Sequence, residues 1–128
     1  MTENEKSIMT ATPTEVREEG IGIARSYLEH RGYEVTEETT DTADIVAYEG
    51  NTAVLVTVAA TVDRDGEGPL PSLEIEKETI QKLRRACLTY ATVHDEVSSV
   101  RADLISITIV GVGKARLRHL VGAWSWEE

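Results

Sequence analysis

The sequence ADIVAYEGNTAVLVTVAA, residues 43–60, contains two apolar runs separated by the polar tetrapeptide EGNT. This pattern predicts a β-hairpin with strands over residues 43–48 and 53–61. The second run is apolar at consecutive positions, which is typical of a central strand covered on both faces. Asp44 stands near the start of the first strand, so the hairpin brings one acid next to an otherwise apolar pair of strands.

Helical and β-branched segments flank this hairpin. Residues 12–15, TPTE, form a helix N-terminal signature and are followed by apolar residues at helical spacing. A short strand is predicted over 33–35, a second helix over 73–94, and two more strands on either side of a turn at 111–113. The order α-β-β-β-α-β-β predicts an α/β fold in which a mixed β-sheet is flanked by helices.

Length and composition indicate a small globular protein. The 128 residues suffice for one domain, so we expect a single domain over 12–128 after a disordered tail at 1–11. The N-terminus has no signal pattern, and no apolar run approaches the roughly 20 residues of a membrane helix. Cys87 is the single cysteine and is expected to pack on a helix in the core, which fits a reducing compartment. We therefore expect a cytoplasmic protein without membrane contact.

The charge of the chain is unevenly distributed around a net value of −10. Residues 1–49 hold twelve acids and four bases, whereas residues 82–118 hold seven bases and three acids. Overall acidity argues against strong non-specific binding of DNA, because neutralised phosphates supply most of that affinity. The basic segment still allows weak contact with DNA or RNA, although solvated helix and strand faces are the alternative explanation. The candidate cations are Lys82, Arg84, Arg85, Arg101, Arg116 and Arg118.

Other residues give weaker signals. His30, His94 and His119 lack metal-ligand spacing, so surface or half-buried roles are expected for them. Trp124 and Trp126 flank Ser125 and would share one face of a strand, which favours core packing or, alternatively, a patch that binds a protein partner or a second copy of the chain.

Four segments taken together resemble the YraN-like family of small proteins. They are GIGIARSYLEHRGYEV at 20–35, ADIVAYEGNTAVLVTV at 43–58, LRRACLTYA at 83–91 and VRADLISITI at 100–109. The resemblance implies a restriction-endonuclease-like fold, in which related metal-dependent nucleases carry an Asp on one strand and Glu and Lys on the next. It also implies a match between the family's later Arg-x-Asp and Arg101-x-Asp103.

The resemblance fails at the residues that would perform catalysis. Laid on this chain without a gap, the family's Asp falls on Asp44, an earlier Glu on Thr42, and the Glu and Lys of the second strand on Thr57 and Ala59. In such nucleases Mg²⁺ takes oxygen ligands from the carboxylates, and the Lys orients water or stabilises developing charge. Here Asp44 alone implies a weak metal site, Thr57 offers one neutral oxygen, and Ala59 offers none.

Three interpretations follow. The first, which we favour, is a non-catalytic member of the family that binds nucleic acid weakly and requires no cofactor. The second is an active nuclease whose Mg²⁺ or Mn²⁺ ligands have moved to the acids that follow the hairpin, namely Asp63, Asp65, Glu67, Glu74 and Glu76. The third is a protein-interaction module that uses the Trp124-Ser125-Trp126 segment.

Overall fold

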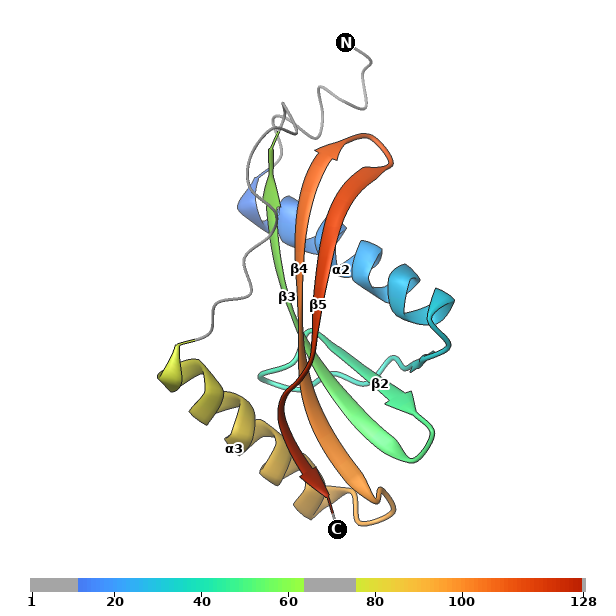
Figure 1. Ribbon diagram of the computed structural model, residues 1–128, viewed down its shortest axis with the longest axis vertical. Coiled ribbons are helices and arrows are strands. Elements are labelled where there is room, and N and C mark those ends of the chain that lie inside the picture. The colour runs from blue at the N-terminus through green and yellow to red at the C-terminus, as the bar shows by residue number, and fades with distance from the viewer. Residues whose placement is uncertain (1–11, 64–75, 128) are drawn as a thin grey trace.

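A computed structural model describes residues 12–63 and 76–127 of the chain (Figure 1). Two helices and five strands follow the predicted order α-β-β-β-α-β-β, which confirms the α/β fold. The expected tail at 1–11 and the first residues of the predicted second helix lie outside the described residues. No described helix has the length and apolar character needed to span a membrane. The elements are α2 (Pro13–His30), β1 (Glu34–Val35), β2 (Ile45–Glu49), β3 (Thr52–Val62), α3 (Lys77–Val93), β4 (Ser99–Gly111) and β5 (Lys114–Glu127).

The first helix, α2, begins at the predicted capping signature. The Thr12 side chain accepts a hydrogen bond from Glu15 N–H at 3.2 Å, and the Glu15 carboxylate reaches back to the Thr12 backbone, so two orphan helix donors are satisfied. Along the helix, Gly20 faces β3. A Cβ atom built on Gly20 would lie 2.5 Å from the Cβ atom of Ala60, so only glycine allows α2 to cross β3 this closely.

The five strands form one sheet in the order β1-β2-β3-β4-β5. The central pair, β3 and β4, is parallel, and the other neighbours are antiparallel. The hairpin predicted from residues 43–60 is β2–β3, with Glu49 paired to Thr52 across a two-residue turn. Parallel neighbours need a long crossover connection, and α3 lies within the one that joins β3 to β4.

The two helices cover opposite faces of the sheet and lie toward opposite ends of it (Figure 1). Val54, Val56 and Val58 of β3 point to the α2 face, while Ala53 and Leu55 point to the α3 face. The first half of β3 is therefore buried on both sides, as its continuous apolar run predicts. In its second half, burial alternates from one residue to the next, and the residues with odd numbers from 57 to 61 are more exposed than their neighbours.

Candidate functional site

Asp44 lies just before β2 begins, where β3 continues past its partner strand. Its backbone N–H donates to the Val56 carbonyl oxygen at 2.8 Å, and its Oδ2 accepts a hydrogen bond from Val58 N–H at 2.7 Å. Its Oδ1 forms an ion pair with the guanidinium of Arg17, which reaches over from α2. The Asp44 side chain is 9% exposed. Both carboxylate oxygens therefore already have a donor supplied by the protein.

Thr57 and Ala59 lie beside Asp44 on the α3 face of β3. Thr57 is half-buried and Ala59 is exposed. A hard divalent cation such as Mg²⁺ takes six oxygen ligands, which are usually one or two ionised carboxylates together with waters and substrate oxygens. One carboxylate that is already paired with Arg17, one neutral hydroxyl and one methyl group do not make that set. The residues at these three positions therefore do not fit Mg²⁺ or Mn²⁺.

The acids after the hairpin give no replacement within the described chain. Asp63 donates its backbone N–H to Ile109 at 2.9 Å at the end of β3, and Glu76 precedes α3 as its N-cap residue. Asp65, Glu67 and Glu74 lie outside the described residues. Within 12–63 and 76–127, no three His, Cys, Asp or Glu side chains are grouped so that they could hold a metal ion.

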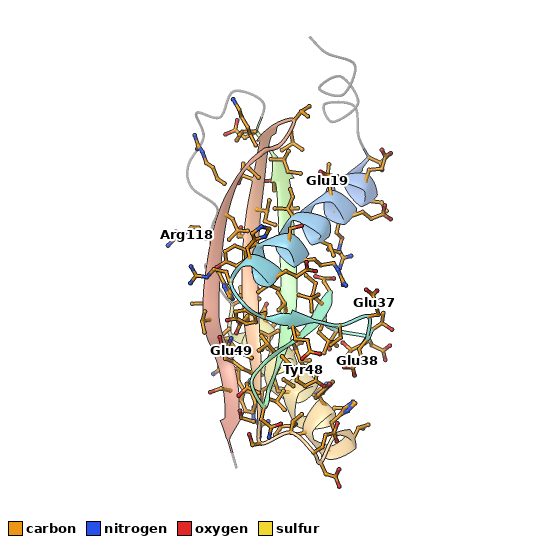
Figure 2. The ribbon with its side chains drawn as sticks, turned by 90° about the vertical axis from the view of Figure 1, so that its right-hand side faces the viewer. Glu19, Glu37, Glu38, Tyr48, Glu49 and Arg118 are labelled. Atoms are coloured by element: carbon orange, nitrogen blue, oxygen red, sulfur yellow. The ribbon has the colours of Figure 1, made fainter. Side chains whose placement is uncertain are left out.

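The candidate cations occupy three different environments. Lys82 and Arg85 are exposed on α3 and line a cavity, whereas Arg84 is exposed but does not line it. The separation follows from helix geometry, because positions 82 and 84 differ by about 200° around the helix axis. Arg116 and Arg118 lie on the edge strand β5, and Arg118 projects outward from that edge (Figure 2).

Arg101 is engaged inside the protein. Its Nε and Nη2 donate to the two carboxylate oxygens of Asp103 at 2.8 and 3.1 Å. Its Nη1 donates to Glu49 at 3.1 Å, and its Nη2 also donates to the Tyr33 hydroxyl at 2.9 Å. Burial opposes the charged form, but the hydrogen bonds and the charge of Asp103 outweigh it and raise the pKa of Arg101. The guanidinium is therefore a permanent internal charge.

Asp103 is the centre of a buried network on the α2 face. It is fully buried and accepts hydrogen bonds from Arg101, from His119 Nε2 at 2.7 Å, and from the Gly122 backbone N–H at 2.9 Å. His119 Nδ1 lies 3.0 Å from the Tyr27 hydroxyl of α2, which fits an imidazole that donates to Asp103 and accepts from Tyr27. Burial acts to raise the pKa of Asp103, but these donors outweigh it and lower that pKa.

The Gly122 contact explains an irregularity in β5. Ala102 pairs with Trp124 and Leu104 with Leu120, so three residues of β5 stand opposite the single residue Asp103. Gly122 adopts φ +70°, a left-handed conformation that favours glycine. The bulge leaves the Gly122 N–H without a carbonyl partner on β4. The Asp103 carboxylate accepts this N–H instead.

A cavity of about 530 Å³ opens between α3 and residues 38–42, on the α3 face of the sheet. The α3 wall carries Lys82 and Arg85 and continues to Tyr90 and His94. Thr39, Thr40 and Thr42 line it from the connection before β2, and the buried Leu55 contributes from β3. Thr42, which matches an acidic position of the YraN-like pattern, therefore borders this cavity.

Glu38 stands at one end of the cavity and is held by two tyrosines. The Tyr90 and Tyr48 hydroxyls lie 3.2 and 3.3 Å from its carboxylate oxygens and are hydrogen-bonded to each other at 2.5 Å. One tyrosine therefore donates to the other, and the second donates to Glu38. Figure 2 shows Glu38 and Tyr48 close together. Burial raises the pKa of both tyrosines, so the hydroxyls stay protonated and remain donors. His94 stacks on Tyr90 with ring centroids 3.9 Å apart.

Two further expectations concern apolar residues. Cys87 is fully buried in the core under α3, as predicted, and burial raises the pKa of its thiol to about 12. Trp124 is half-buried and packs against the same core, so its ring supports the sheet. The side chain of Trp126 lies outside the described residues.

Sequence patterns missed the buried network and the cavity. His119 is half-buried as a residue, as expected, but its side chain is 6% exposed and its partner Tyr27 is 92 residues away in the chain. The resemblance pointed to Arg101 and Asp103, but nothing in the local sequence signals that the pair closes on His119 and Gly122. Glu38 lies in a polar connection, where an acid is ordinarily a solvated residue.

Comparisons with known proteins identify the family. No family model matches the chain. It is 32% identical over 98 residues to a UPF0102 protein of Thermodesulfovibrio yellowstonii, an alignment that covers 73% of this chain and 85% of that protein. It is 25% identical over 107 residues to a UPF0102 protein of Chlorobium chlorochromatii, covering 80% and 81% of the two chains. These relatives confirm the resemblance found in the sequence, and the chain belongs to the UPF0102, or YraN, family.

Proposed function

We propose that this UPF0102 protein is a nuclease-like scaffold that binds nucleic acid without cleaving it. The observation that carries the proposal is the pairing of Asp44. Its carboxylate already accepts from Val58 N–H and is neutralised by Arg17, so a cation would compete with the charge of Arg17 for the one acid that matches the catalytic pattern. With Thr57 and Ala59 beside it, the position lacks both the second carboxylate and the amine.

The binding surface in this proposal is the α3 side of the sheet. In the strand register, Ala59 pairs with Ser106 and Ser106 pairs with Arg118, so Arg118 lies two strands from the position that matches the lost lysine. Neighbouring strands are about 4.8 Å apart, which puts the two backbones about 10 Å apart. Arg116 lies two residues earlier on the same face. These two arginines, with Lys82 and Arg85 of α3, supply positive charge on the side where the catalytic pattern has been lost.

The affinity expected from this surface is low and strongly dependent on salt. The whole chain has a net charge of −10, so contact with phosphates must be local. Four cations that neutralise four phosphates would give a slope of about −3 to −4 in a plot of log affinity against log salt. Arg101 is excluded from the proposed surface because it is committed to Asp103. Arg84 is also excluded, because it does not line the cavity that holds Lys82 and Arg85.

Fluorescence anisotropy of labelled single-stranded, duplex and branched DNA at low salt tests the proposal, with and without Mn²⁺. We expect salt-dependent binding, intact DNA on a gel, and weaker binding by Arg118→Gln than by the matched control Arg84→Gln. Cleavage that requires Mn²⁺ and disappears in Asp44→Ala would overturn the non-catalytic part of the proposal. If no DNA or RNA binds, the nucleic-acid part is wrong and the protein-interaction interpretation takes its place.

A further inference from the structure

The cavity beside α3 has charged groups of opposite sign at its two ends. Lys82 and Arg85 stand at the end nearer the start of α3, and both are exposed. Neither makes a hydrogen bond or ion pair with any residue in the described part of the chain. Glu38 stands at the other end, near Tyr90 and His94. Along the helix, Arg85 and Tyr90 are five residues or about 7.5 Å apart, so the two ends are separated by roughly the length of one small organic ligand.

The Glu38 end is built to present a fixed carboxylate. The hydrogen-bonded hydroxyl groups of Tyr48 and Tyr90 contact it, His94 Nε2 lies 3.8 Å from its Oε1, and its side chain keeps 38% of its surface exposed. An ionised carboxylate has about four acceptor sites, so two adjacent N–H donors of a ligand still find acceptors there. Because the tyrosines already orient the group, little conformational entropy is lost when a ligand binds to it.

The middle of the cavity is less polar. Leu55 from β3 and Ala86 from α3 line it, and Val93, which is 70% exposed, lines the cavity beside Tyr90 and His94. Thr39, Thr40 and Thr42 complete the lining. A volume of about 530 Å³ lies within the range of sites for small organic molecules. The expected ligand therefore has a weakly polar body between two ends of different charge.

We infer that this cavity binds a guanine nucleotide that carries one 5′-phosphate, with the base edge on Glu38 and the phosphate between Lys82 and Arg85. Guanine presents two adjacent donors, N1–H and the exocyclic amino group, and these match the two oxygens of a carboxylate. The phosphate matches two cations that have no partner within the described residues. A purely cationic ligand would be repelled by Lys82 and Arg85, and a purely anionic one by Glu38.

The same chemistry has two sources, namely a free guanosine monophosphate and an unpaired guanosine at the 5′ end of a strand. Asp41 also lines the cavity, and its negative charge disfavours a triphosphate relative to a single phosphate. The inference shares Lys82 and Arg85 with the proposed function but not Arg116 or Arg118. Binding of the free mononucleotide therefore tests the cavity by itself.

The test is a heteronuclear NMR titration of the isotopically labelled full chain with guanosine monophosphate, adenosine monophosphate and guanosine. We expect guanosine monophosphate to shift resonances of residues 38–42 and of α3, and to bind about tenfold or more tightly than adenosine monophosphate, which lacks the paired donors. Guanosine lacks the phosphate, so we expect its affinity to be lower than that of guanosine monophosphate by a similar factor. A short strand with a 5′-phosphorylated guanosine then shows whether the polymer end is also accepted.

Two pairs of variants control for general charge effects. Glu38→Gln should weaken the binding of guanosine monophosphate about tenfold and remove the preference over adenosine monophosphate. The control Glu37→Gln, which changes the exposed neighbour paired with Arg25, should leave both affinities unchanged. Arg85→Gln should weaken the binding of both monophosphates, while Arg84→Gln should leave their binding unchanged. Equal binding of both monophosphates, or shifts that Glu38→Gln leaves unchanged, would contradict the inference. If no monophosphate binds at millimolar concentration while DNA still does, the cavity inference fails and the proposed function stands; the reverse result would reject the proposed function alone.

Discussion

Two aspartates, Asp44 and Asp103, lie close to Val56 of the central strand but in different surroundings. Asp44 donates its backbone N–H to the Val56 carbonyl, and Asp103 pairs with Val56 across the β3–β4 ladder. Asp103 is fully buried and receives hydrogen bonds from two side chains and a backbone amide. Asp44 sits at the end of β2, where its side-chain partner is an arginine that is 56% exposed.

The difference shows that the two parts of the family pattern are held in the fold to different degrees. The Arg-x-Asp motif is used to close β5 over its bulge and to connect the sheet to α2 through His119 and Tyr27. Its residues are therefore required for the fold whatever the protein binds. The hairpin position holds an acid whose charged partner, Arg17, is exposed, so substitutions there should change ligand chemistry more than stability.

The largest expected effect comes from Asp103→Asn. This change removes the buried one of the two carboxylates paired with Arg101, and we expect a loss of about 3–5 kcal/mol in the free energy of unfolding. Urea denaturation followed by circular dichroism measures it. Glu49→Gln removes the other, 54% exposed partner of Arg101 and should cost about 1 kcal/mol or less. Equal losses in the two variants would show that Asp103 is no more structural than a surface acid.

The pH dependence of stability sharpens the same point. The pKa of Asp103 is lower in the folded protein than the ordinary value of about 4. Its stabilising contribution is therefore complete above about pH 4 and is lost as pH falls through the folded pKa. The stability difference between wild type and Asp103→Asn should be constant from neutral pH down to about pH 5 and shrink below pH 4. Urea titrations at several pH values measure this, and a difference that grows on acidification would refute the assignment.

A smaller effect is expected when a carboxylate is restored beside Asp44. Thr57→Glu adds a like charge to a half-buried place and should destabilise the protein by about 1 kcal/mol. Mn²⁺ should reverse that loss, because two neighbouring carboxylates begin to resemble a hard-cation site. Thermal unfolding with and without Mn²⁺ measures the rescue. Thr61→Glu, which places the same charge farther along the same face, should show no rescue. If both variants respond equally to Mn²⁺, the Asp44 position has no inherited geometry.

The smallest effect is expected from Arg17→Gln. The pair with Asp44 joins one mostly buried and one mostly exposed side chain, and such pairs contribute about 0.5 kcal/mol. The difference between wild type and variant should shrink as salt is added. Chemical denaturation at low and high salt measures it. A loss that reached the size of the Asp103→Asn effect would contradict the contrast between the two aspartates.

Local chemistry predicted the elements of this fold but not how distant side chains meet. The capping residues of α2, the hairpin of residues 43–60 and the burial of Cys87 on α3 all follow from spacing, turn residues and residue type, and the structure confirms them. The Arg17–Asp44 pair and the Tyr27–His119 contact join α2 to the sheet, so they depend on a packing angle that no local pattern encodes. The bulge opposite Asp103 was missed because Gly122 lies within an otherwise regular run of strand residues.

The central parallel pair has a consequence for how the chain folds. Every pairing between β3 and β4 joins residues 47 positions apart, as in the Thr52–Ser99 contact. The β2–β3 and β4–β5 hairpins close short turns, so they are able to form within microseconds and before the long crossover closes. The slow step is then the meeting of two preformed hairpins, because that step carries the loop-closure entropy. Stopped-flow refolding should therefore slow when Val54 or Val100 is truncated at the seam between the hairpins, whereas truncations in α2 should mainly speed unfolding.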